Sequence, residues 1–213
     1  IDKKLSDVRK NIAESEEALR LSTTTTTQFT SPTTTLAPVV SSEYVSISNR
    51  SFYFKQNKFV PVSDTAWQLA EKLSKEDIQY YLDQRKKQGF NAIKFGVTGN
   101  AFTKNSIKFP NEAHFNHLEY ILTELSKRNM FAEFGVGLTY IYGPPSKVLP
   151  ESEAYEYGRF VANRFKKHKN IWTWIVNGLD DKNVSNNAII QIAKGIKSVA
   201  PQMLVTFHAA HGF

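Results

Sequence analysis

Acidic, amide, aromatic and histidine side chains follow the apolar segments of this sequence, at the points where the segments end. Taken segment by segment, they are Asp64, Thr65 and Trp67; Thr98 and Asn100; Thr139, Tyr140 and Tyr142; Asn177, Asp180 and Asp181; and His208 and His211. Aromatic faces stack on sugar rings, while carboxylates and amides bond to hydroxyl groups. Hydrolysis of a glycosidic bond needs one carboxylic acid to protonate the leaving oxygen and a second carboxylate to attack or to activate water. These residue types therefore favour a site that binds or cleaves carbohydrate.

The residues needed for several other kinds of reactive site do not occur in the sequence. The sequence contains no cysteine, which excludes disulfides, thiolate zinc sites and cysteine nucleophiles. His208 and His211 stand close together, but two histidines without a third ligand are weak support for a metal. We therefore expect neither a metal nor another cofactor.

The elements that must position these side chains alternate between two patterns. Five apolar segments are predicted as strands, and four amphipathic segments between them are predicted as helices. The strands are expected at 59–63, 91–97, 130–138, 171–176 and 204–207, and the helices begin after Ser74, after Asn111, at about 152 and after Ser185. This alternation predicts a parallel sheet with right-handed crossovers.

Two architectures fit a parallel sheet of this kind, an open doubly wound sheet or part of an eight-fold barrel. The open sheet usually carries a glycine-rich phosphate-binding turn after its first strand, whereas the turn here, Asp64-Thr65-Ala66-Trp67, has no glycine. The turn favours the barrel and disfavours a nucleotide or phosphate enzyme. A complete (β/α)8 TIM barrel needs about 250 residues, and about 157 follow from Asn57 to Phe213. We therefore expect a partial barrel of about five strand-helix units, with reactive groups at the carboxyl ends of the strands.

The N-terminal part differs in kind from the rest. Residues 1–21 have apolar residues at helical spacing and predict an amphipathic helix, which is either a stalk or a frayed end. Residues 22–43 are rich in threonine and proline, a composition typical of a disordered, O-glycosylated linker. Residues 44–213 form the predicted barrel unit, which opens with a short β-hairpin over 44–54. Two N-glycosylation sequons, at Asn49 and Asn183, agree with an extracellular or cell-surface location.

Charge and hydropathy limit the possible partners. The net charge is +7, but the basic runs at 85–87 and 166–169 end amphipathic helical patterns, where cations are expected. We therefore expect a carbohydrate substrate and no nucleic acid. No run of eighteen apolar residues occurs, so no membrane span is expected in this chain. The sequence does not determine the oligomeric state.

Several of these side chains also have a structural interpretation. Asp64 either contacts sugar or binds nearby backbone amides, and Trp67 either stacks on sugar or packs as part of the core. Trp172 and Trp174 are expected to pack against helices. Glu133 lies mid-strand and is expected to pair inside the barrel rather than to react.

Short motifs throughout the barrel unit carry a resemblance to a known family. They are Asn49-Arg50-Ser51-Phe52, Phe59-Val60-Pro61-Val62-Ser63-Asp64-Thr65-Ala66-Trp67, Tyr81-Leu82, Gly89-Phe90-Asn91, Pro110-Asn111-Glu112-Ala113-His114-Phe115, Leu138-Thr139-Tyr140, Tyr155-Glu156-Tyr157-Gly158-Arg159, Asn170-Ile171-Trp172 and Thr206-Phe207-His208. With them the sequence resembles the apiosidase-like glycoside hydrolases over about Val45 to Phe213. The resemblance implies a TIM-barrel catalytic domain, often secreted, that acts on plant-type or other complex glycans.

The resemblance also implies roles for individual residues. The catalytic acid of the family looks to be the Asp of a Gly-Gly-Asp tripeptide after the fourth strand, and Asp180 is its best match here. Asn177 replaces the first glycine, and Leu179 separates Gly178 from the acid. The expected substrate-binding residues are Asp64, Trp67, Tyr140, Asn177, Asp181 and His208. The second carboxylate is expected on a later strand beyond Phe213, so this chain alone is expected to be inactive. The alternative is a catalytically inactive carbohydrate-binding or surface-display domain on a mucin-like stalk.

Overall fold

The computed structural model describes residues 43–99, 101–104, 106–137, 148–177 and 185–208. The chain divides into two units, Ile1–Pro38 and Val39–Phe213. The first unit lies outside the described residues. The helix predicted over 1–21 and all but the last residue of the linker predicted over 22–43 are therefore not among them and stay predictions.

The described part opens with a small antiparallel sheet. Its strands are β1 (Ser46–Ser48), β2 (Ser51–Phe54) and β3 (Asn57–Phe59), paired in that order. The turns Asn49–Arg50 and Lys55–Gln56 have positive φ at both residues, as in the two-residue turns that suit hairpins. The predicted hairpin thus gains a third strand. The strand predicted over 59–63 was wrong in its start, because Phe59 belongs to β3 and Pro61, which has no N–H, interrupts the segment.

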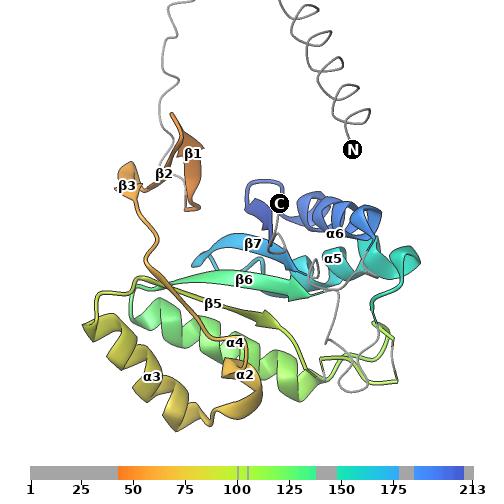
Figure 1. The fold of residues 1–213 in the computed structure, drawn as a ribbon, viewed down its shortest axis with the longest axis horizontal. Helices are drawn as coiled ribbons and strands as arrows, with labels where there is room; N and C mark the ends of the chain where they lie inside the picture. The colour runs from red at the N-terminus through yellow and green to blue at the C-terminus, as the bar shows by residue number, and fades with distance from the viewer. Residues whose placement is uncertain (1–42, 100, 105, 138–147, 178–184, 209–213) are drawn as a thin grey trace, which may run out of the picture. The chain divides into compact units, whose positions relative to one another are not determined.

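A five-stranded parallel sheet follows. Its strands are β4 (Ser63–Thr65), β5 (Ala92–Val97), β6 (Phe131–Gly137), β7 (Ile171–Asn177) and β8 (Leu204–Phe207), and their order in the sheet is their order in the chain. Every neighbouring pair is parallel. This order, with helical crossovers, is that of consecutive units of a (β/α)8 barrel, so the predicted fold class is confirmed (Figure 1).

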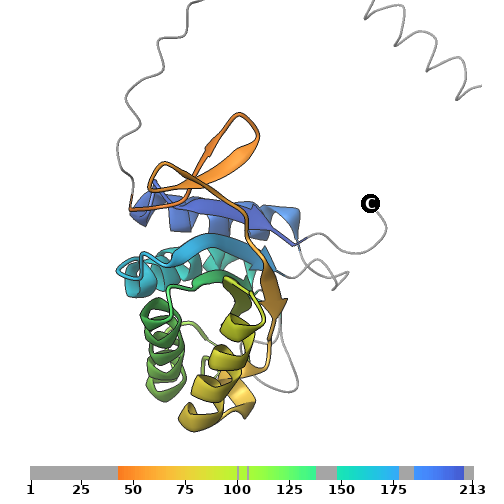
Figure 2. The same ribbon diagram turned by 90° about the vertical axis from the view of Figure 1, so that its left-hand side faces the viewer.

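Helices connect these strands. They are α2 (Leu69–Lys72), α3 (Lys75–Lys87), α4 (Glu112–Lys127), α5 (Glu151–Phe165) and α6 (Asn186–Val199). The Ser74 hydroxyl accepts from the Asp77 N–H and the Asp77 carboxylate accepts from the Ser74 N–H, which completes the capping box at the start of α3. Asn111 and Ser185 cap α4 and α6 with their side chains. In Figure 2, α3 (yellow) and α4 (green) lie side by side along the sheet. The short α2 was not predicted.

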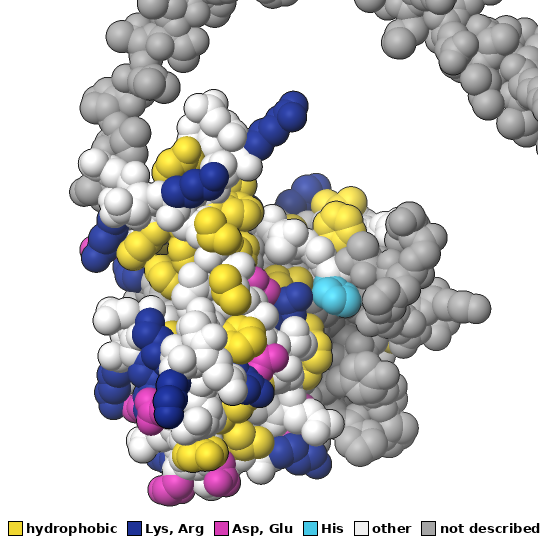
Figure 3. Space-filling model, turned by 60° about the vertical axis from the view of Figure 1, so that its left-hand side comes forward, with side chains coloured by type: hydrophobic (Ala, Val, Ile, Leu, Met, Phe, Trp, Pro, Cys, Tyr) yellow, Lys and Arg dark blue, Asp and Glu magenta, His cyan; other side chains and the backbone are white. Residues whose placement is uncertain are grey.

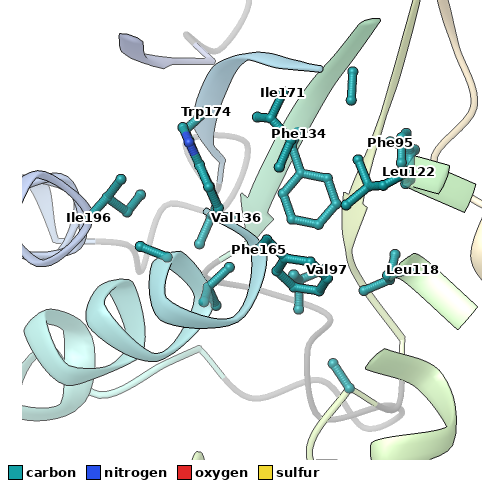
Figure 4. Close-up of a cluster of buried hydrophobic side chains, with 14 of the residues drawn as sticks. Phe95, Val97, Leu118, Leu122, Phe134, Val136, Phe165, Ile171, Trp174 and Ile196 are labelled. Carbon is teal, nitrogen blue, oxygen red and sulfur yellow. The ribbon is translucent and has the colours of Figure 1, made fainter. Parts of the chain in front are cut away.

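The main core lies between the parallel sheet and its helices. Phe134 of β6 is at its centre, with ring centroids 5.4 Å from Phe95, 5.5 Å from Trp174 and 4.9 Å from Phe165 of α5 (Figure 4). In β5 and β6 the residues of this core alternate along the strand, so the helices cover one face of the sheet. The other face is the inner face of the barrel. Lys94, Glu133 and Thr173 lie on it, at matching positions of β5, β6 and β7.

A second, smaller core joins the antiparallel sheet to the amino ends of the parallel strands. The Trp172 ring centroid lies 5.1 Å from that of Phe52 and 5.6 Å from that of Phe59. Both tryptophans are core residues, as expected, but only Trp174 lies in the core beneath the helices, so the expectation that Trp172 packs against helices was wrong. A register shift between Ala132 and Glu133 takes Trp172 out of the regular alternation and places it under the small sheet.

Some apolar side chains of this end stay exposed. Ile47 and Val60 are each 60% accessible, and Figure 3 shows hydrophobic side chains gathered toward the antiparallel sheet. No helix among the described residues is long and apolar enough to cross a membrane.

Candidate functional site

The parallel strands bring their carboxyl ends to one rim, where two residues singled out in the sequence meet. Trp67 follows β4 and His208 follows β8, yet their ring centroids are 6.5 Å apart in an edge-to-face arrangement. These strands are the two outermost of the five. In a flat sheet, four spacings of about 4.8 Å would put them about 19 Å apart. The contact therefore requires the sheet to curl, as it does in a barrel.

Backbone bonds hold both residues at this rim. The Thr98 hydroxyl at the end of β5 donates to the Trp67 carbonyl at 3.3 Å. The Ala66 N–H donates to the Lys94 carbonyl at 2.8 Å, and the His208 N–H donates to the Val176 carbonyl at 3.0 Å. Both rings are only half-buried. An aromatic face with a fixed backbone and a partly free ring is suited to stacking on a sugar.

Asp64 lies on the helix-facing side of β4. It is in register with Ile93, a residue of the main core. The Asp64 Oδ2 accepts hydrogen bonds from the Tyr81 hydroxyl at 2.7 Å and from the Arg85 Nε, both on α3, and its Oδ1 accepts from the Thr65 N–H at 2.8 Å. These bonds tie β4 to α3. The expected sugar contact of Asp64 stays a prediction, and none of these bonds provides it.

The electrostatics of this cluster agree with its geometry. Burial raises the pKa of Asp64, but the hydrogen bonds from Tyr81 and Arg85 and the charge of Arg85 outweigh burial and hold the pKa below its ordinary value. Burial and the bond to Asp64 raise the pKa of Tyr81 to about 12. The Arg85 guanidinium also stacks on the Tyr81 ring, 4.9 Å from its centroid. At neutral pH the cluster is thus an ionised carboxylate held by a neutral phenol and a cation.

A second ion pair lies on the inner face of the sheet. The Lys94 Nζ is 3.6 Å from the Glu133 Oε2, between the neighbouring strands β5 and β6. This contact confirms the expectation that Glu133 pairs inside the barrel. Lys94 itself was missed in the sequence. Its signal was a lone cation within the otherwise apolar segment Ala92–Val97.

Other residues of the predicted site cannot be placed. Tyr140, Asp180 and Asp181 lie outside the described residues, and so do Asn100, Thr139, Tyr142 and His211. Asn177 is the last residue of β7 and pairs in register with Gly137, so its backbone reaches the rim. Within the described ranges, no three His, Asp or Glu side chains are grouped so that they could hold a metal.

The parallel sheet is curled, its outer face is covered by helices, and it ends in a rim with aromatic and polar side chains. These features define a partial (β/α)8 barrel of the kind found in glycoside hydrolases. The chain belongs to the apiosidase-like family, because the model of the apiosidase-like catalytic domain matches residues 48–212. No protein with a curated description matches the sequence.

Solved structures share this fold. A protein described as a glycoside hydrolase superposes with a TM-score of 0.65 at 24% identity, covering 78% of this chain and 41% of its own. A glycoside hydrolase family 5 protein from Bacteroides vulgatus ATCC 8482 gives 0.64 at 20% identity, with 78% and 39% covered. An endo-1,4-beta-mannanase from Rhizomucor miehei gives 0.60 at 13% identity, with 80% and 62% covered. The chain thus spans about two fifths of the first two of these proteins.

Proposed function

We propose that this chain forms the N-terminal part of a glycoside hydrolase barrel that cleaves O-glycosidic bonds of complex, plant-type glycans by carboxylate acid/base catalysis. The observation that carries the proposal is the meeting of Trp67 and His208 across the rim. It supports a sugar ring bound between the carboxyl ends of the first and fifth barrel strands, where (β/α)8 enzymes hold their substrates.

In this proposal Asp180 is the general acid/base. It follows β7, the fourth barrel strand, which is where the family motif has its acid. A general acid in this role must hold its proton until the leaving oxygen takes it. Trp67 and His208 bind the sugar together with Tyr140, Asn177 and Asp181. The mechanism also needs a second carboxylate, to attack or to activate water, and a chain without it would not hydrolyse the bond.

The proposal includes a location. The threonine-rich segment 22–43 and the two sequons support a secreted or cell-surface glycoprotein. The Asn49 sequon occupies the exposed turn between β1 and β2. The antiparallel sheet packs on the amino ends of the barrel strands, so a glycan there would leave the opposite rim free.

A second candidate function is a catalytically inactive carbohydrate-binding or display domain. One observation favours it, the departure of Asn177-Gly178-Leu179-Asp180 from the Gly-Gly-Asp pattern of the family. Both functions use the same rim, and they differ only in whether a proton donor stands in the correct place.

One experiment separates the two functions. The full-length protein and its Asp180→Asn variant are assayed for hydrolysis and for binding on a panel of branched plant glycans. The enzyme proposal predicts hydrolysis by the parent, loss of at least a hundredfold in kcat in the variant, and unchanged folding and binding. Unchanged turnover in the variant would remove Asp180 from its role. Binding without hydrolysis in the parent would favour the inactive domain.

A further inference from the structure

The ion pair on the inner face of the sheet has hydrogen-bonding capacity that the described residues do not use. The Lys94 Nζ and the Glu133 Oε2 are 3.6 Å apart, and their side chains are 23% and 12% exposed. This separation is longer than a hydrogen bond. Neither charged group makes any other polar contact in the part of the chain that the structure describes. An ammonium has three donors and a carboxylate about four acceptor positions, and the described residues use few of them.

The setting of the pair is unusual for a barrel interior. Bulky aliphatic side chains normally fill such interiors in layers. Here the same level of the inner face carries Thr65, Lys94, Glu133 and Thr173 in register across four strands. A buried ion pair contributes little net stability, because the cost of removing both charges from water offsets their attraction. Stability alone therefore gives little reason for a Lys and a Glu at these positions.

The pair lies mid-strand in β5 and β6, but level with the carboxyl end of the short strand β4. Lys94 is in register with Thr65, the last residue of β4, and its carbonyl accepts from the N–H of Ala66. Trp67, whose ring meets His208, is the next residue. Two residues of extended chain span about 7 Å, roughly the size of one sugar ring. A ring stacked on Trp67 would thus lie within one sugar unit of Lys94 and Glu133.

We propose that Lys94 and Glu133 form a binding pair that reads two neighbouring hydroxyl groups of a neutral sugar held at the rim. The Glu133 carboxylate accepts a hydrogen bond from one hydroxyl, and the Lys94 ammonium donates to the oxygen of the next. Neighbouring hydroxyl oxygens on a ring are about 3 Å apart, a separation that suits two partners 3.6 Å apart. This inference rests on the proposed carbohydrate function and deepens it by naming the chemistry of the bound sugar.

The charge balance of the pair favours a neutral sugar over an acidic one. A uronate would be attracted by Lys94 but repelled by Glu133, whose Oε2 lies only 3.6 Å from the Lys94 ammonium. A diol meets no such conflict, because each hydroxyl is both a donor and an acceptor.

The test compares single and double variants of the full-length protein. Lys94→Met and Glu133→Gln are made singly and together, and Lys127→Met serves as the control. Lys127 also pairs with a glutamate, Glu124, at 2.6 Å, but on the helix α4 of the outer layer. Affinities are measured by calorimetry for neutral branched plant oligosaccharides, their monodeoxy analogues and matched uronate-bearing oligosaccharides, and thermal melts follow folding.

The proposal predicts a loss of at least tenfold in affinity for the neutral probes in each single variant and none in Lys127→Met. In the double variant the melting temperature recovers, because no unpaired charge remains, but the affinity does not. The parent should bind one of the monodeoxy analogues at least tenfold more weakly than the unmodified oligosaccharide. The variants should bind this analogue and the unmodified oligosaccharide with equal affinity.

Three results would overturn the proposal. Parent-like affinity in folded single variants would make the pair purely structural and leave the carbohydrate function intact. Preference for the uronate probes would exclude the neutral diol. Failure of the parent to bind any probe, at the rim or elsewhere, would remove both this inference and the proposed function.

Discussion

Replacement of Asp64 tests whether this residue anchors β4 to helix α3. Asp64→Ala leaves the Tyr81 hydroxyl and the Arg85 guanidinium without their acceptor. Hydrogen bonds to a charged group contribute about 1.5–3 kcal/mol each. Arg85 is 31% exposed, so water replaces part of its lost hydrogen bond. The sum of the two hydrogen bonds that Asp64 accepts from Tyr81 and Arg85 therefore overstates the loss of stability. We expect a loss of about 2–4 kcal/mol in the free energy of unfolding. Asp64→Asn, which still accepts from Tyr81, should lose about 1–2 kcal/mol.

The assay is urea unfolding of the full-length protein, followed by tryptophan fluorescence and circular dichroism. A loss of 2–4 kcal/mol corresponds to about 4–16 °C in Tm for a domain of this size. Asp83→Asn is the matched control, because Asp83 also lies on α3 and pairs with an arginine, Arg128, but is 60% exposed. The control should be as stable as the parent. Parent-like stability of Asp64→Ala together with lost sugar affinity would refute the anchoring role and support the sugar contact instead.

Three further predictions follow from other features of the fold. The pKa of Asp64 is lower in the folded chain than in the unfolded one, so the Asp64 carboxylate stabilises the fold fully above about pH 4 and loses this effect as the pH falls through its folded pKa. In acid, the free energy of unfolding of Asp64→Asn should therefore change less steeply with pH than that of the parent. An equal slope would contradict the Asp64 cluster. Gly158→Ala should lower the free energy of unfolding by about 1–3 kcal/mol, because the new Cβ would lie 2.3 Å from the Ile192 carbonyl oxygen. This loss outweighs a gain of about 1 kcal/mol in helix propensity. A variant that is more stable in urea unfolding would contradict the close packing of α5 and α6. Residues 44–213 expressed alone should aggregate, because β4 and β8 are the edge strands of the parallel sheet and Phe207 is 59% exposed. A monomer in light scattering that unfolds cooperatively in calorimetry would contradict this prediction.

The sequence was most informative where one physical signal decided the structure. Ser74 with Asp77, and Ser185 before an apolar repeat, predicted helix starts that the structure confirms. The apolar run at 204–207 predicted a strand with the same bounds. In each case the deciding contacts are local, so neighbouring residues carry the whole signal.

The sequence was less informative where distant parts of the chain decide. Asp64 of β4 is in register with Ile93 of β5, which lies 29 residues further along the chain. Its side-chain partners Tyr81 and Arg85 are 17 and 21 residues away, on helix α3. No local pattern around Asp64 predicts these contacts. Trp172 shows the same limit, because the pairing of β7 with β6 skips this residue and so displaces it from the pattern.

The pairing of residues at the rim was not predictable from the sequence. The residues at the strand ends predicted a carbohydrate-binding rim, and two of them, Trp67 and His208, lie next to each other. Which residues meet depends on how far the sheet curls, and no local pattern encodes that curvature. Lys94 was missed because a single cation in a strand has many structural explanations until its partner is known.

Binding of a saccharide at the rim formed by the carboxyl ends of the strands can be seen in a crystal structure. The full-length Asp180→Asn protein is crystallised with a branched plant oligosaccharide. We expect a sugar ring in contact with Trp67 and His208 and within hydrogen-bond distance of Lys94 or Glu133. A saccharide bound at the antiparallel sheet, or on the helix layer, would contradict this expectation.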